Sequence, residues 1–213
     1  MDVNMQWHHE MRGKKAVEAL AKNGFTAVYF PDRASAADHL ISLVPDGAGV
    51  GFGGSMTIQA MDLAPKLLQK SCTLFDHGKA GLSPEERVVM RRKQLTADVF
   101  LCSSNAVTMH GELVNVDGTG NRTAAMMFGP ERVIVAVGTN KLVNTLDEAH
   151  ARIKTVAGPV NNKRLNLANP CVESGECMNC RSKSRICNIT TIIRRRPPLT
   201  DIHVLVIGED LGF

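Results

Sequence analysis

Short apolar runs alternate with amphipathic segments along most of the chain. The runs expected to form strands are 25–30, 48–52, 72–76, 98–102, 112–116 and 132–138. The segments expected to form helices are 12–21, 34–44, 56–70, 83–95, 122–129 and 145–157. Several of the strands are apolar throughout, which is typical of strands buried on both faces. The pattern therefore predicts an α/β fold in which helices cover both faces of a mostly parallel sheet.

Local signals place some helix boundaries. Ser83, Pro84 and Glu86 predict a capped helix start with a capping box, and Thr145 with Glu148 predicts another. Pro65 is expected to kink or shorten the helix predicted over 56–70.

The alternation ends at Gly158, where Asn and Pro residues lead into a cysteine-rich segment. Two further strands are expected, within 188–196 and 203–210. We therefore expect a single domain over 1–213, with 158–213 as a C-terminal extension that packs on the sheet or completes it.

The sequence GVGFGG at 49–54 matches the G-x-G-x-x-G pattern of dinucleotide-binding folds. Gly49 and Gly51 fall inside the predicted strand, however, and no lysine follows as a P-loop would require, so neither interpretation is favoured. A turn of Gly53, Gly54 and Ser55 at the strand's carboxyl end, leading into a helix, suits a carboxylate or phosphate instead. A turn needed only for strand–helix packing is the alternative.

A second strand end, DGTGNR at 117–122, has the same character. Asn121 is expected to cap the next helix and Arg122 to add a cation beside it. Ligands of open α/β sheets bind at the carboxyl ends of strands, so these turns and SSN at 103–105 are expected to converge on one cleft. The candidate ligand-binding residues are Gly53, Gly54, Ser55, Thr57, Asn105, Asp117, Gly118, Thr119, Gly120, Asn121 and Arg122.

Glu112 is the candidate catalytic residue. It lies five positions before Asp117, so on a regular strand the two carboxylates face opposite sides and do not form an acid/base pair. Cys102, at the end of an apolar strand, is favoured as a core residue over a nucleophile.

Four cysteines, Cys171, Cys177, Cys180 and Cys187, follow the spacing C-x5-C-x2-C-x6-C. The C-x2-C pair suits a tetrahedral sulfur site, so metal binding is favoured over structural or redox thiols. A [4Fe-4S] cluster is the preferred metal because nearby basic residues would offset its charge, and zinc is the alternative.

Composition excludes little. The chain has 213 residues, 44% of them hydrophobic, and a formal net charge of +4, so it can bury a core and nucleic acid is not an expected partner. No signal peptide or membrane-length apolar run is evident, which predicts no membrane insertion and a cytoplasmic location. Disulfides rarely persist there, which again favours metal binding by the cysteines.

Taken together, GVGFGGSMT, the stretch 98–141, the cysteine segment and the terminal VIGEDLGF resemble the LUD-domain family, the lactate-utilisation proteins of the LutC/YkgG type. The resemblance covers nearly the whole chain after the first dozen residues. It implies a fold similar to the NagB/RpiA/CoA-transferase group. It also implies a part in the oxidation of lactate to pyruvate in bacterial cytoplasm, within a multi-protein system.

Two departures qualify that resemblance. LutC-type members generally lack the four-cysteine segment, and the ferredoxin-like motifs of the LutB-type partner are absent here. The chain therefore resembles a branch whose substrate need not be lactate.

The favoured function is a component of an organic-acid oxidation system, hence an oxidoreductase component. Its expected partners are a small anionic acid or phosphate-bearing ligand and other lactate-utilisation proteins, and a homo-oligomer is left open. The alternatives are a CoA transferase or sugar-phosphate isomerase that uses Glu112 beside a structural metal, and a zinc module that binds nucleic acid.

Overall fold

The computed structural model describes residues 2–213, and its centre is a six-stranded sheet in which every neighbouring pair of strands is parallel. The strand order is β1-β10-β7-β4-β2-β3. The strands are β1 (Thr26–Phe30), β2 (Gly49–Phe52), β3 (Thr73–Phe75), β4 (Val99–Cys102), β7 (Arg132–Gly138) and β10 (Asp201–Ile207). The prediction of a mostly parallel α/β sheet is confirmed.

A smaller, mixed sheet of four strands lies beside it, in the order β8-β5-β6-β9. Its strands are β5 (Ala106–Thr108), β6 (Leu113–Asp117), β8 (Leu142–Val143) and β9 (Ile189–Ile193). Strand β6 pairs antiparallel with both β5 and β9, while β5 and β8 are parallel.

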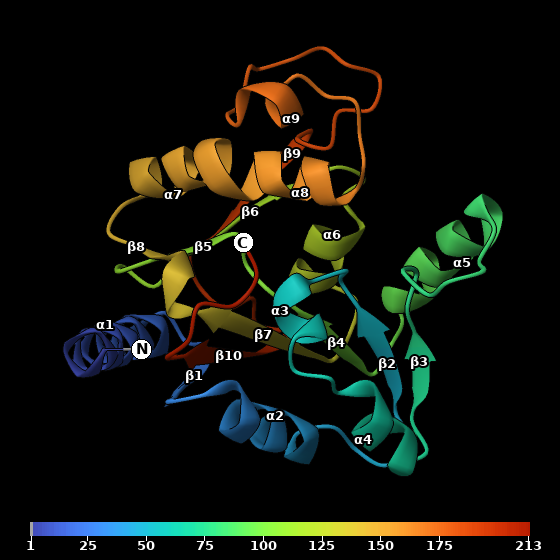
Figure 1. Ribbon diagram of the computed structural model, residues 1–213. Helices are drawn as coiled ribbons and strands as arrows, with labels where there is room; N and C mark the ends of the chain where they lie inside the picture. The colour runs from blue at the N-terminus through green and yellow to red at the C-terminus, as the bar shows by residue number, and fades with distance from the viewer. Residues whose placement is uncertain (1) are drawn as a thin grey trace.

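Helices cover both sheets. They are α1 (Val3–Lys22), α2 (Arg33–Ser42), α3 (Met56–Gln59), α4 (Ala64–Gln69), α5 (Pro84–Gln94), α6 (Asn121–Met127), η1 (Thr139–Lys141), α7 (Leu146–Arg152), η2 (Ile153–Ala157), α8 (Gly158–Arg164) and α9 (Cys171–Ser174). Figure 1 shows α2 and α4 on one side of the six-stranded sheet, and α7 and α8 beyond the smaller sheet on the other.

The hydrophobic core follows these layers. Leu40, Leu67 and Leu205 belong to a cluster between the six-stranded sheet and α2–α4. Phe100 and Leu113 belong to a second cluster that joins the two sheets. A third, smaller cluster joins the four-stranded sheet to α7 and η2. The six-stranded sheet is thus covered on both faces, as its apolar strands require.

Some helix boundaries differ from the prediction. The capping box at Ser83 is present, but the helix expected over 56–70 is two helices, with Pro65 in the first turn of the second. Thr145 caps α7, yet the Glu148 carboxylate accepts from the N–H of Asn144, so no complete box forms there. Helix α1 begins at Val3 because the Asp2 carboxylate caps it, well before the predicted start at residue 12.

The largest difference concerns Gly158, where helical structure was expected to end. Instead α7 continues through the π-helical turn η2 into α8, which ends at Arg164. Pro159 has no N–H to donate back along the helix, and the Lys154 carbonyl, five residues earlier, accepts from the N–H of Cys177 instead (2.8 Å). The sequence signal was therefore misleading: Gly and Pro mark a change of helical pitch, not a helix end.

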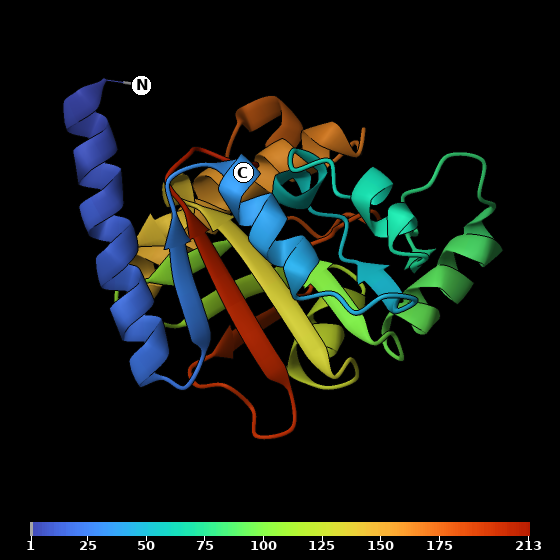
Figure 2. The ribbon, with the colours of Figure 1, turned by 90° about the horizontal axis from the view of Figure 1, so that it is seen from below.

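Residues 158–213 are part of both sheets. Strand β9 forms an edge of the smaller sheet, and β10 lies inside the larger one, paired with β1 and β7. Figure 2 shows β10 in red between the blue β1 and the yellow β7.

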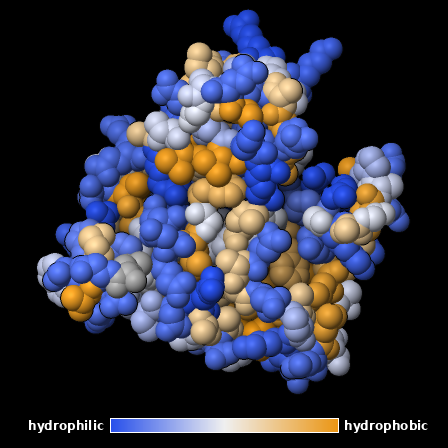
Figure 3. Space-filling model, viewed as in Figure 1, coloured by the Kyte–Doolittle hydropathy of each residue, from blue (hydrophilic) through white to orange (hydrophobic). Residues whose placement is uncertain are grey.

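Helix α5 projects from the body of the molecule (Figure 1). Figure 3 shows the surface on the same side, where hydrophobic residues are visible on this projection, and Val88 and Val89 are exposed there. Within residues 2–213, no helix combines the length and apolar character that crossing a bilayer requires.

Candidate functional site

A cleft of about 250 Å³ lies where three strand-end segments meet. Residues 53–56 follow β2 and residues 103–105 follow β4. The third segment runs from the end of β6 (116–117) through the turn 118–119 to Asn121 and Arg122 in the first turn of α6. The three turns singled out in the sequence are thus brought together. Of the candidate ligand-binding residues, Thr57 and Gly120 do not line the cleft: Thr57 is buried behind it and Gly120 occupies the N-cap position of α6.

The glycine turn after β2 is closely packed. A Cβ atom on Gly53 would lie 3.0 Å from Cys102 Cβ and 3.3 Å from Arg122 Cδ. Gly54 has a φ of +72°, which favours glycine, and the Ser55 hydroxyl caps α3 by accepting from the N–H of Ile58. These contacts support a packing role for the glycines, while their place at the mouth of the cleft keeps them as candidates for ligand binding.

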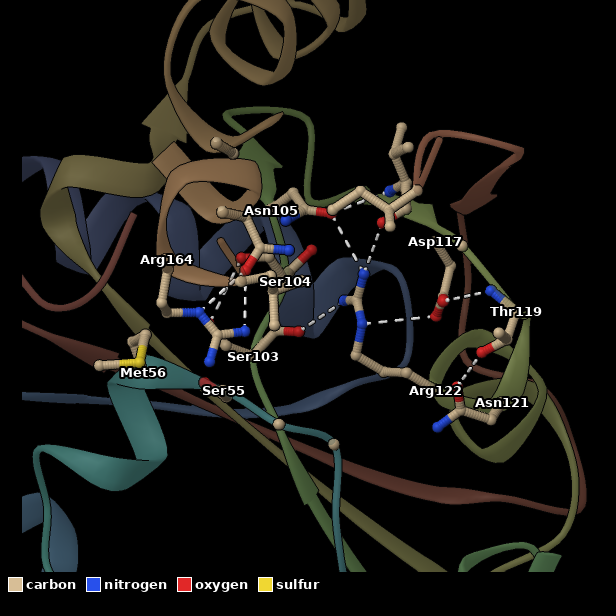
Figure 4. A pocket seen from close by; sticks show the side chains of 18 of the residues that line it. Ser55, Met56, Ser103, Ser104, Asn105, Asp117, Thr119, Asn121, Arg122 and Arg164 are labelled. Carbon is tan, nitrogen blue, oxygen red and sulfur yellow. Dashed lines mark hydrogen bonds and ion pairs between the residues drawn. The ribbon is translucent and has the colours of Figure 1, made fainter. Parts of the chain in front are cut away.

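Arg122 is held within the wall of the cleft. Its guanidinium donates to the carbonyls of Ser103 (3.0 Å) and Val116 (2.9 Å) and to Asn105 Oδ1 (3.2 Å). Nε also lies 3.6 Å from Asp117 Oδ2. Figure 4 shows this guanidinium at the centre of the contacts that join the two turns. Arg122 was expected to provide a cation beside the helix. Its guanidinium instead links the turn after β4 to the end of β6, and these contacts use its donors.

Asp117 organises the start of α6. Its Oδ1 accepts from the N–H groups of Thr119 and Gly120, both at 3.3 Å, and Oδ2 accepts from Thr123 N at 3.3 Å. Asn121, predicted to cap the helix, is its first residue instead, and its side-chain oxygen accepts from the Thr119 hydroxyl. The Asp117 carboxylate, four residues before Asn121, thus performs the capping that the sequence assigned to the amide.

Lys141 also lines the cleft, and the sequence analysis missed it. It follows β7 in the short helix η1, is only 3% exposed, and donates to Thr57 Oγ1 (2.8 Å) and Ser103 Oγ (3.0 Å). Burial, and then the nearby charges of Arg152 and Arg122, lower its pKa to about 7. The rule that ligands bind at carboxyl ends of strands, applied to β7 as well, would have found it.

Arg91 of α5 and Arg164 of α8 contribute two further cations to the lining. Arg164 donates from Nε and Nη2 to Asn161 Oδ1, at 3.0 and 2.8 Å, and Figure 4 shows it entering the cleft from α8. Within residues 2–213, neither these arginines nor Lys141 forms a salt bridge with a carboxylate. The sequence analysis identified neither arginine. Arg164 lies in α8, which was not predicted, and the pattern of α5 predicts a solvent-exposed helix with no special role for Arg91.

His77 completes this side of the cleft and adds no charge. Burial first, and the neighbouring Arg91 next, lower its pKa, and Nδ1 lies 2.9 Å from Gln94 Nε2. The cleft is therefore lined by the cations Arg91 and Arg164 and by the buried Lys141 amine, while its acid, Asp117, is occupied by N–H groups at the start of α6 and by Arg122.

Glu112 lies apart from the cleft lining, just before β6. One carboxylate oxygen accepts from Arg194 Nη1 at 2.7 Å, and the other accepts from the Thr108 hydroxyl at 3.1 Å. These contacts tie the β5–β6 turn to the end of β9. A catalytic role for Glu112 stays a prediction that the geometry of this cleft does not support.

Cys102, which the sequence favoured as a core residue over a nucleophile, is fully buried in the core cluster between the sheets, so that prediction is confirmed. Burial raises the pKa of its thiol to about 12, which leaves it protonated and unreactive at neutral pH.

The cysteine segment 171–187 begins with α9, which lies beyond α8 at one end of the molecule (Figure 1). Cys171, Cys177 and Cys187 line a cavity of about 290 Å³ together with Lys154 and Arg185, whereas Cys180 lines a neighbouring surface hollow. Cys177 Sγ accepts from the N–H of Asn179 at 3.4 Å. Within residues 2–213, no three Cys, His, Asp or Glu side chains are arranged to hold a metal ion, so the compact cluster expected from the spacing is not seen.

The cysteine segment also touches the cleft. Ile186, the residue before Cys187, lines it and packs on Gly118, where an added Cβ would lie 3.2 Å from Ile186 Cα. On the other side of Cys187, Asn188 donates from its backbone to the carbonyl of Asp117 (3.0 Å) and from its side chain to that of Gly118 (3.1 Å).

The LUD domain family model matches residues 13–207. The chain belongs to the LUD domain family. A solved structure, a DUF162 family protein from Deinococcus radiodurans, shares its fold with this LUD domain at a TM-score of 0.53 and 14% sequence identity. The alignment covers 94% of this chain and 98% of that one. Among curated proteins, no match to this LUD domain was found.

Proposed function

We propose that this LUD domain binds a small anionic organic acid in the cleft, as a component of a lactate or related organic-acid oxidation system. One observation carries the proposal: Arg91 and Arg164 line the cleft, and within residues 2–213 neither forms a salt bridge with a carboxylate. Cations left without a counter-ion at the carboxyl edge of a parallel sheet favour an anionic ligand. The link to lactate comes from family membership, and the family's other lactate-utilisation proteins are the proposed partners.

The size of the cleft bears on the class of acid. At about 250 Å³, its volume lies below the range of roughly 300–1,000 Å³ that is typical of sites for drug-sized ligands. The side-chain oxygen of Asn105 is bonded to Arg122, which leaves its NH2 group facing the cleft lining as a donor for a remaining polar atom of a ligand. These features favour a three- or four-carbon acid over a coenzyme A thioester.

Substitution of Arg164 tests this function. Arg164→Gln should weaken the binding of pyruvate, lactate or inorganic phosphate about tenfold, since one charge-assisted contact contributes about 1.5 kcal/mol. Isothermal titration calorimetry of the three anions gives the affinities. Lys163→Gln is the matched control because it removes the same charge from the adjacent exposed position, outside the cleft lining. Equal affinity in the two variants, or no binding of any of the anions, would end the proposal.

We also propose that Cys171, Cys177, Cys180 and Cys187 bind a metal, as a [4Fe-4S] cluster or, alternatively, zinc. The C-x2-C spacing, the cavity shared by three of the thiols and the cationic neighbours Lys154 and Arg185 support this. Cys180 would have to turn toward that cavity. A cluster there would supply electron transfer, whereas zinc would only stabilise the fold of the cysteine segment.

Metal analysis separates these possibilities. Protein purified without oxygen should contain iron and acid-labile sulfide if a cluster binds, and Cys180→Ser should lower that content. Stoichiometric zinc in colourless protein would remove the electron-transfer role, and protein free of all three elements after reconstitution would contradict metal binding.

A further inference from the structure

The hydrogen bonds around Lys141 leave one position on its nitrogen unused. The Thr57 hydroxyl donates to the carbonyl of Leu211 at 3.0 Å, and the Ser103 hydroxyl donates to that of Ser104 at 3.3 Å. Both hydroxyl hydrogens are thus committed, so both oxygens accept from Lys141 Nζ. A neutral amine has two hydrogens, and here both are used. Its lone pair is the group left over.

The surroundings of Lys141 favour that neutral form. The amine is buried, and the charged groups that face it are Arg122 from α6 and Arg152 from α7. Among the described residues 2–213, the acidic group that acts on it is the Cys102 thiol of β4, which burial itself holds protonated. Desolvation and neighbouring cations are the two means by which proteins activate a lysine as a nucleophile.

The cleft also provides for the rest of a ligand. Arg91 and Arg164 line it with Lys141 and have no carboxylate partner within residues 2–213. A carboxylate held by these arginines would place a neighbouring carbon in the same small cleft as the lysine nitrogen. An acid with a carbonyl next to its carboxylate matches this pairing of two cations with one nucleophile.

We propose that Lys141 Nζ forms an imine with the carbonyl carbon of a 2-oxo acid held in the cleft. This deepens the proposed function, on which it rests, by naming the class of acid. In the reaction a nitrogen–carbon double bond replaces the carbonyl carbon–oxygen double bond. The oxygen leaves as water with the two amine hydrogens, so no oxidant or reductant is consumed. Protonation of the imine returns one hydrogen to the nitrogen, which one of the two hydroxyls can accept.

Reduction by borohydride tests the imine directly. The folded full-length chain is incubated with pyruvate, glyoxylate or 2-oxoglutarate, and borohydride then converts any imine into a stable secondary amine. Intact mass spectrometry and peptide mapping should show one adduct, on Lys141, with at least one of the three acids. Lactate has a hydroxyl in place of the aldehyde or ketone carbonyl and should give no adduct. Absence of a Lys141 adduct with all three acids, or equal labelling of exposed lysines, overturns the proposal.

Variants provide the control. Lys141→Arg should lose the adduct, whereas Lys79→Arg, at an exposed position, should keep it. Because the wild-type peptide map is decisive by itself, a variant that fails to fold does not weaken the test.

The two proposals fail separately. If the acids bind in calorimetry but leave no adduct on Lys141, the imine is wrong and the anion site stands. If Lys141 is labelled although lactate and phosphate do not bind, the cleft accepts 2-oxo acids only, and the part of the proposed function that concerns lactate is wrong.

Discussion

Arg122 is the residue on which the shape of the cleft wall depends. It lies at the start of α6, yet it bonds at once to the turn after β4 and to the end of β6. A guanidinium can do this because its donors form a rigid, planar fork, whereas a lysine amine acts as a single point of charge. The side chain therefore fixes the distance between two of the three turns.

Replacement of this fork should destabilise the fold. Arg122→Lys keeps the charge near Asp117 but leaves several buried acceptors without a donor, so we expect a loss of about 2 kcal/mol in the free energy of unfolding. Urea denaturation measures it. The control Arg92→Lys, on the exposed side of α5, should change stability by no more than about 0.5 kcal/mol. Equal stability of the two variants would show that the fork is dispensable.

The lowered pKa of Lys141 predicts a pH dependence of stability. The pKa falls from 10.5 to about 7 on folding, so between these values the unfolded chain binds more protons than the folded one. Stability attributable to this group therefore rises with pH over that window, by up to about 1.4 kcal/mol per pH unit. Below about pH 7 both states hold the proton, and the cost of burying the charge is present in full.

Lys141→Met removes the titrating group and supplies the reference. The unfolding free energy of the wild type minus that of the variant should increase between about pH 7 and about pH 9, as measured in urea at each pH. A difference that stays constant across this range would mean that Lys141 keeps its charge in the folded protein.

At the scale of elements, strands and their order along the chain were predictable, because apolar runs report burial on both faces of a sheet. The ends of strands also pointed to the three turns. The partners of Arg122 could not be predicted, since Asn105 and Asn115 become its neighbours only after β5 and β6 fold back. Arg164 was missed for another reason: Gly158 and Pro159 looked like a helix end, and only the π-helical turn carries the helix on to it.

Gly111 and Gly175 have the same backbone conformation but different surroundings, so substitution by alanine should destabilise the fold to different extents. Gly111 and Gly175 both have a φ of +78°, but an added Cβ at Gly111 would lie 2.5 Å from the carbonyl carbon of Ala19 in α1, while at Gly175 nothing lies within 4 Å. Alanine should cost about 1 kcal/mol at Gly175 from the backbone alone. At Gly111 the forced separation from α1 should raise the total to about 3 kcal/mol.

Thermal or urea unfolding of the two alanine variants compares these costs. Similar losses at both positions would mean that α1 can move away from the β5–β6 turn without cost, contrary to the contact.

At the scale of the whole molecule, residues 158–213 cannot be separated from the rest. They supply β10 to the larger sheet and β9 to the smaller one. The sequence predicted that this region would pack on or complete the sheet, but not that its last strand would lie between β1 and β7. Which strands are neighbours is set by packing among distant segments, and a hydrophobic pattern does not encode it.

Truncation tests this dependence. A chain of residues 1–157 should show no cooperative unfolding transition in urea, because removal of β10 leaves β1 without its sheet neighbour. A chain lacking residues 1–8 should still unfold cooperatively, since Val3, Met5 and Trp7 in the first turns of α1 are exposed. A cooperative transition in the first chain would establish a separate domain.

The position of β10 also has a consequence for synthesis in the cell. Residues 26–30 and 132–138 leave the ribosome well before residues 201–207, yet the last of these must enter between the first two. Until then the facing edges of β1 and β7 have unpaired backbone groups, which invite pairing with other chains. Aggregation during expression should therefore depend on how fast the final part of the chain is translated, even when the finished protein is stable.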